Sequence, residues 1–162
     1  MRVLKIVCWS ALVGALACGD GVSAPETTFD GIKYTAATNT ITSANGATQF
    51  TVLVTLENTT GGTLTRTYPA TCPVRIKLYR ASDQALLYDE SRRDCDMSIT
   101  ATLTIGGRET AQVSSGVRFA QNVLGDSLPS TTYNVKALVL TECTKTVLID
   151  AGQYTLNPGP QG

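Results

Sequence analysis

Histidine is absent from all 162 residues of the chain. Its absence removes the commonest general base of enzymes, the usual Ser–His and Cys–His nucleophile pairs, and most zinc and copper sites. Chemistry based on carboxylates or lysine is still open. We therefore expect a protein that is not an enzyme and that carries neither a metal ion nor a cofactor.

A basic excess is also missing, because 13 Lys and Arg residues stand against 13 Asp and Glu residues. The longest basic run is the pair Arg92-Arg93. Binding to DNA or RNA depends on clusters of positive charge that neutralise phosphates, so we expect no nucleic-acid partner. Long apolar runs are scarce as well. After residue 17, none approaches the roughly 20 residues of a membrane-spanning helix.

Residues 1–17 have the three parts of a bacterial signal peptide. Arg2 and Lys5 supply the positive charge at its start. The uncharged stretch 6–17 has the length of a signal-peptide hydrophobic region and is too short for a stable transmembrane helix. We therefore predict export with cleavage before Cys18, which becomes the first mature residue.

The residues around Cys18 resemble a lipobox, the motif whose cysteine is acylated in bacterial lipoproteins. One position departs from it, because Ala15 stands where Leu is usual and Leu16 follows. The plain alternative is a secreted protein cut at the same bond. Residues 18–28 have the small, polar composition of a flexible tether, and Gly19 resembles lipoproteins of the outer membrane in two-membraned bacteria. We predict a cell-envelope lipoprotein attached to the membrane through lipid on Cys18.

Five cysteines are present. Cys8 belongs to the signal peptide and Cys18 is the predicted lipid acceptor, so three remain for the exported domain. Outside the cytoplasm thiols tend to pair, and three thiols give one disulfide and one leftover. We favour Cys72–Cys95, which would join the start of a strand to the end of the following loop and stabilise the fold by roughly 3 kcal/mol. The rival pairing is Cys72–Cys143.

The exported domain is rich in Thr, Val and Ile, which favour strands. Apolar and polar residues alternate with a period of two at Gln49–Asn58, Pro73–Arg80 and Thr132–Thr141. This period is typical of strands with one face on a core. Weaker strands are expected at Gly31–Ala36, Leu86–Asp89, Ser98–Ile105, Glu109–Ser115 with Val117–Ala120, and Thr146–Leu156. We predict an all-β protein, a two-sheet antiparallel β-sandwich at residues 29–157 with a tail at 158–162.

Short motifs follow one another between residues 48 and 157. One strand ends in Glu57-Asn58, another in Ile105-Gly106-Gly107, and a third runs through Tyr133-Asn134-Val135-Lys136-Ala137. Together they resemble the immunoglobulin-like module named after the BsuPI intracellular proteinase inhibitor. That family has a proline turn where this chain has Gly106-Gly107, and its frequent tryptophans are missing from the exported part, because the single Trp of the chain is Trp9. The resemblance implies an immunoglobulin-like sandwich of seven to eight strands. An exported lipoprotein does not share an intracellular inhibitor's task, so only the fold is carried over.

The most charged stretch lies at residues 88–96. It contains four carboxylates that can offer oxygens to Ca²⁺, namely Asp89, Glu90, Asp94 and Asp96. Their spacing is not that of a known calcium loop, and Arg92 and Arg93 would compete for them, so a solvated, self-paired loop is favoured. A second hypothesis makes Arg92 and Arg93, held by Cys95, a contact loop that faces a trypsin-like protease.

Three classes of function fit these observations. We favour a non-catalytic binding or interaction module at the cell envelope, whose sandwich edges or loops hold a protein or glycan partner. The alternative is an envelope proteinase inhibitor, suggested by the family resemblance and by Arg92-Arg93. The third is an enzyme that uses the carboxylates of residues 89–96.

Overall fold

The computed structural model describes residues 26–90, 98–125, 128–141 and 145–159, without the side chains of 141 and 145. Strands account for nearly all of the regular structure, together with one short helix. Their bounds are β1 (Glu26–Phe29), β2 (Ile32–Thr42), β3 (Thr48–Asn58), β4 (Leu64–Pro69), β5 (Val74–Arg80), β6 (Leu86–Asp89), β7 (Thr100–Ile105), β8 (Thr110–Ser114), β9 (Arg118–Phe119), α1 (Ala120–Leu124), β10 (Thr131–Thr141) and β11 (Lys145–Leu156).

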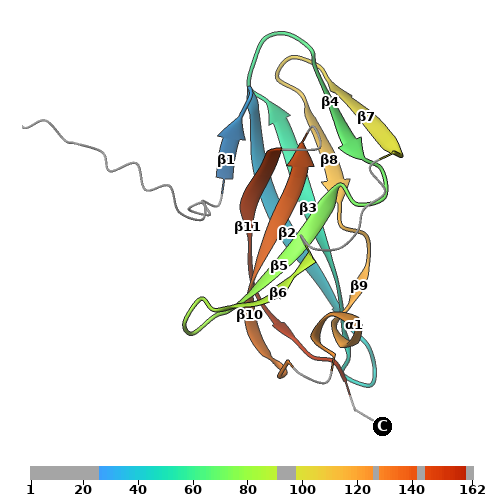
Figure 1. The fold of residues 1–162 in the computed structure, drawn as a ribbon, viewed down its shortest axis with the longest axis vertical. Helices are drawn as coiled ribbons and strands as arrows, with labels where there is room; N and C mark the ends of the chain where they lie inside the picture. Colours follow the sequence, from blue (N-terminus) through green and yellow to red (C-terminus); the bar gives the residue numbers. More distant parts are fainter. Residues whose placement is uncertain (1–25, 91–97, 126–127, 142–144, 160–162) are drawn as a thin grey trace, which may run out of the picture.

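Most strands form two sheets that pack face to face, and β4 and β7 pair with each other as a separate two-stranded sheet (Figure 1). The first sheet has the order β1-β2-β3-β8, with β9 also paired to β3, and the second has the order β11-β10-β5-β6. All strand pairs are antiparallel. The predicted all-β antiparallel sandwich is therefore confirmed. The path β2-β3-β8 opposite β11-β10-β5-β6 is the strand order of an immunoglobulin-like domain.

The core lies between the two sheets and is built by alternation along the strands. In β3 every second side chain from Thr48 to Asn58 is buried, as the period of two predicts. In β5, Val74, Ile76 and Leu78 point inward and are fully buried. Each such aliphatic side chain contributes about 1.5–3 kcal/mol relative to an exposed one. The same alternation leaves most polar residues of both strands on the outer faces, whereas Thr48 and Asn58 at the two ends of β3 are buried.

Strand β10 departs from the expected one-sided burial. Tyr133, Val135 and Ala137 face the core, but Leu138 and Leu140 on the opposite face are also only 7% and 8% exposed. The period of two predicts a strand with only one face on the core. Its outward leucines break the apolar–polar alternation, and both faces of β10 are withdrawn from solvent at this end.

The connection into β10 contains a tyrosine corner. The hydroxyl of Tyr133, near the start of β10, donates a hydrogen bond to the carbonyl of Pro129 four residues upstream. In immunoglobulin-like domains such a corner marks the strand that corresponds to β10 here. The short helix α1 precedes this corner and buries Ala120, Val123 and Leu124. Among the described residues, no helix is long and apolar enough to cross a membrane.

Two strands were not expected from the sequence. Strand β1 occupies part of the segment assigned to the tether, so the folded domain begins by Glu26 rather than at residue 29. It turns into β2 through Asp30 and Gly31, which have φ values of 47° and 76°. Two positive φ angles in a two-residue hairpin loop are those of a type I′ turn. Strand β4 ends at Pro69 and pairs only with β7 within the described chain.

Candidate functional site

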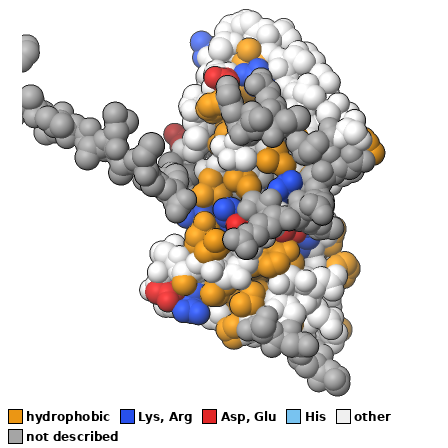
Figure 2. All heavy atoms as spheres, in the orientation of Figure 1, with side chains coloured by type: hydrophobic (Ala, Val, Ile, Leu, Met, Phe, Trp, Pro, Cys, Tyr) orange, Lys and Arg blue, Asp and Glu red, His pale blue; other side chains and the backbone are white. Residues whose placement is uncertain are grey.

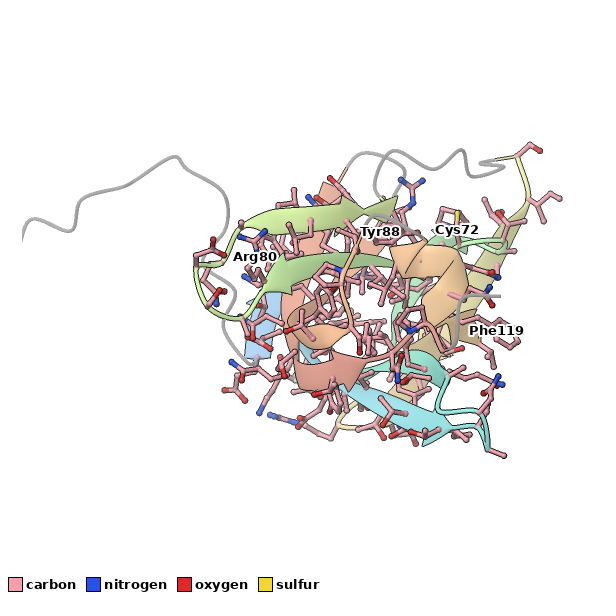
Figure 3. All side chains as sticks on the ribbon, turned by 90° about the horizontal axis from the view of Figure 1, so that it is seen from below. Cys72, Arg80, Tyr88 and Phe119 are labelled. Atoms are coloured by element: carbon pink, nitrogen blue, oxygen red, sulfur yellow. The ribbon has the colours of Figure 1, made fainter. Side chains whose placement is uncertain are left out.

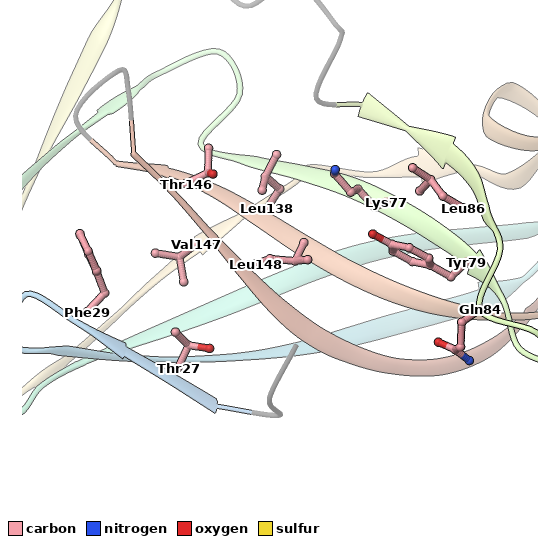
Figure 4. A pocket seen from close by; sticks show the side chains of 10 residues that line it. All are labelled: Thr27, Phe29, Lys77, Tyr79, Gln84, Leu86, Leu138, Thr146, Val147 and Leu148. Atoms are coloured by element: carbon pink, nitrogen blue, oxygen red, sulfur yellow. The ribbon is translucent and has the colours of Figure 1, made fainter. Parts of the chain in front are cut away.

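A groove of about 620 Å³ crosses the outer face of the second sheet (Figure 4). This size lies within the range of small-ligand sites in proteins. Strand β1, the β5–β6 hairpin, β10 and β11 supply its walls. Its lining residues are Thr27, Phe29, Lys77, Tyr79, Gln84, Leu86, Leu138, Thr146, Val147 and Leu148.

The alternation of β5 positions the polar part of the groove. Because Ile76 and Leu78 point into the core, Lys77 and Tyr79 project from the outer face. Lys77 lies opposite Lys136 of β10 in the strand register. The two lysines therefore stand on the same face of neighbouring strands.

The apolar part of the groove comes from β10 and β11. Leu138 and Leu148 are direct partners in the β10–β11 register and share the outer face. Leu86 of β6 is 47% exposed, one of the more exposed large hydrophobic side chains in the described residues. Figure 2 shows hydrophobic side chains beside Lys and Arg side chains across this face of the molecule. The face is amphipathic rather than uniformly polar.

Two contacts hold the basic side chains in place. The Lys136 Nζ atom lies 4.5 Å from the centroid of the Tyr79 ring, a cation–π contact of about 0.5–1 kcal/mol at an exposed site. The Lys77 Nζ atom lies 3.4 Å from a carboxylate oxygen of Asp89, and both side chains are 20% exposed. The groove thus presents the Tyr79 ring and the Lys77 ammonium group beside aliphatic side chains, and the Lys136 ammonium group contacts the same ring.

Asp89 and Glu90 are the two carboxylates of the charged stretch that the structure describes, and each pairs with a different residue. Asp89 pairs with Lys77, whereas the Glu90 carboxylate accepts hydrogen bonds from the Arg118 Nε–H at 3.0 Å and the Ile76 backbone N–H at 3.0 Å. The Glu90 side chain is 2% exposed. Within the described ranges, no three His, Cys, Asp or Glu side chains gather as a metal site would require. Glu90 therefore joins the β6 side of one sheet to β9 of the other.

The remaining predicted site residues are only partly covered by the structure. Cys72 lies between β4 and β5, is 8% exposed, and has its sulfur 3.7 Å from the Thr71 hydroxyl (Figure 3). The other predicted site residues, Cys18, Arg92, Arg93, Asp94, Cys95, Asp96 and Cys143, lie outside the described residues. The lipidation, the disulfide pairing and the protease contact loop therefore stay predictions.

Sequence reasoning did not single out Tyr79 or Lys136 as functional residues. A signal for them was present, because Arg75, Lys77 and Tyr79 occupy successive outward positions of β5. What the sequence does not show is that β1 comes to lie beside β11 and adds Phe29 to the groove wall.

Comparison of the chain with protein-family models and with curated proteins gives no match in either case. The resemblance to the BsuPI module therefore stays a prediction, and the groove is the feature that bears on function.

Proposed function

We propose that this chain is a non-catalytic binding module held at the bacterial cell envelope by lipid on Cys18. The observation that carries the binding role is the groove on the outer face of the second sheet, where Tyr79 and Lys77 lie beside aliphatic side chains and Lys136 contacts the Tyr79 ring. Aromatic side chains and a few positioned polar groups in an apolar surface are typical of recognition sites.

The chemistry of the groove favours a protein partner that brings both apolar and acidic side chains. Leu86 and Leu148 offer aliphatic contact, and the ammonium group of Lys136 has no carboxylate partner among the described residues. An acidic group of the partner can approach Lys136 while the aliphatic part of the partner covers the leucines. Charge complementarity of this kind sets orientation and specificity.

The proposed anchor would keep this face close to the membrane. Strand β1 begins at Glu26, so the segment from Cys18 to the domain is short. Fully extended, about eight residues span at most roughly 28 Å. One acyl chain holds a protein only reversibly, and a second chain makes the attachment durable.

Photo-cross-linking in cells that make the full chain tests the binding role. A photoreactive amino acid replaces Leu148 in the groove, and Leu53 in a matched control. Both leucines are half-buried and point outward, but Leu53 lies on the first sheet. We expect a discrete adduct from position 148 and none from position 53.

The same experiment has a clear contrary result. Equal labelling from both positions, or no adduct from position 148, would show that the groove holds no partner. A variant that combines Lys136→Glu with the photoreactive group at position 148 should give severalfold less adduct, because the substitution reverses the charge offered to an acidic partner.

A further inference from the structure

Strands β4 and β7 form a two-stranded ribbon at one end of the molecule (Figure 1), and β7 is one edge of this ribbon. Its strand partner is β4, and the described residues provide no second one. An unpaired strand edge presents a row of backbone N–H and C=O groups, which is a template for pairing with another strand. On the side of β7 away from β4, backbone N–H and C=O groups therefore have no strand partner among the described residues.

The register fixes which residues present these groups. The Ala70 N–H donates to the Ile99 carbonyl at 2.8 Å, next to the β4–β7 pairs. In an antiparallel ladder, every second residue directs both its N–H and its C=O to the same neighbour. Residues 99, 101, 103 and 105 therefore bond toward β4. The backbone groups of Thr100, Thr102 and Thr104 point to the open edge.

The side chains of β7 do not protect this edge. Its sequence, Thr-Ala-Thr-Leu-Thr-Ile, contains no charged residue, no proline and no glycine. Natural sheets protect exposed edges with charges, prolines or bulges. Strand β4 has two such devices, Arg66 and the terminal Pro69, and β7 has neither. The three threonines of β7 are also exposed on one face of the ribbon.

We propose that β7 pairs antiparallel with β7 of a second copy of this chain, about a two-fold axis at Thr102. In this register Thr102 lies opposite Thr102 of the second copy, and Thr100 lies opposite Thr104. All three outward residues then form hydrogen-bonded pairs, so the pattern complements itself. Threonine pairs across strands are favourable, and no like charges meet. The resulting sheet has the order β4-β7-β7-β4 and a closed two-fold symmetry.

Cysteine cross-linking in the full-length chain tests this pairing in a bacterial host that matures lipoproteins. In the proposed dimer, the Cα atoms at position 102 lie about 5.5 Å apart, which suits a disulfide. We expect the Thr102→Cys chain to form a disulfide-linked dimer under mild oxidation. The matched control is Thr67→Cys, since Thr67 is the β4 partner of Thr102 and is exposed on the same face. The control and the wild-type chain should stay at least tenfold less cross-linked.

A second substitution separates strand pairing from mere proximity. Thr104→Pro removes an N–H that points to the open edge and leaves the bonds to β4 in place. Added to Thr102→Cys, it should reduce the cross-linked fraction at least fivefold, while circular dichroism and the melting temperature show that the domain is folded. No dimer from Thr102→Cys, equal dimer from Thr67→Cys, or a dimer insensitive to Thr104→Pro would each overturn the proposal.

Discussion

Asn58 shows how one buried side chain fastens several segments of this protein. It is the last residue of β3 and is fully buried. The two N–H groups of its amide face three carbonyl oxygens, that of Gly62 at 2.7 Å and those of Ile105 and Gly106 at 3.0 Å, so one N–H is shared between two of them. Its amide oxygen accepts from the backbone and the hydroxyl of Thr60 at 2.9 and 2.8 Å. Asn58 thus ties the loop after β3 to the turn after β7.

Substitutions of Asn58 test whether its amide N–H groups are the donors in these hydrogen bonds. Asn58→Ala should lower the free energy of unfolding by about 2–3 kcal/mol, because buried carbonyls lose their partner. Asn58→Asp should be more destabilising at pH 7, because a carboxylate would face three carbonyl oxygens. Urea unfolding measures both variants. The assignment of donor and acceptor would be wrong if Asn58→Asp proved more stable than Asn58→Ala.

At the scale of the elements, the tyrosine corner uses one side-chain hydrogen bond to hold the connection into β10. The Tyr133 hydroxyl can donate to the Pro129 carbonyl only while it is protonated. Burial raises the pKa of Tyr133 above its ordinary value, against a smaller opposing effect of Arg80. A group whose pKa is higher in the folded state stabilises the fold below its unfolded pKa, near 10 for tyrosine, and loses that contribution as the pH rises through its folded pKa.

Replacement of Tyr133 by Phe should therefore change the free energy of unfolding by an amount that depends on pH. Near pH 7, Tyr133→Phe should lower the free energy of unfolding by about 1–1.5 kcal/mol. The difference between the wild type and the variant should shrink as the pH rises above about 10. Urea unfolding at pH 7 and at pH 11 measures it. A difference that stays constant or grows over this range would argue against the hydrogen bond as its source.

Strands β3, β5 and β10 were predictable because apolar and polar residues alternate along each of them, whereas only the first part of the equally long β2 was expected. The periodicity of β3 and β5 indicates their extent and their buried faces, and Lys77 and Tyr79 follow as outward residues. The weaker β1 was missed although Asp30-Gly31, a strong hairpin signal, follows it directly. Strand β4 was missed because its short pattern ends in Pro69, and its partner β7 is far away in the sequence.

The candidate site was less accessible from the sequence than the strands were. Outward positions of a single strand follow from its period, but a groove requires knowledge of which strands are neighbours. The pairing of β5 with β10 brings Lys77 opposite Lys136. The approach of β1 to β11 adds Phe29. Both are non-local contacts that periodicity does not encode.

At the scale of the whole molecule, the two sheets have different outer faces. The outer face of β11-β10-β5-β6 combines leucines, Tyr79 and lysines around the groove. The outer face of β3 in the other sheet carries mainly Gln and Thr side chains, with Leu53 among them. Cys18 lies a few residues before β1 in the sequence, so a lipid on Cys18 would hold the domain near the membrane. The domain would then expose two different outer faces there. The proposed lipid is the link between the fold and its place of action.

The most direct test of the proposed lipid anchor is the chemical state of Cys18 in the mature protein. The full chain is produced in a bacterial host with a labelled fatty-acid analogue, then fractionated and weighed by intact-mass spectrometry. We expect a membrane-bound chain that begins at Cys18 and carries acyl groups. A Cys18→Ser chain keeps the small residues before the cleavage site, so it should be exported, cut and released without label. An unmodified, soluble wild-type chain that begins at Cys18 would contradict the account.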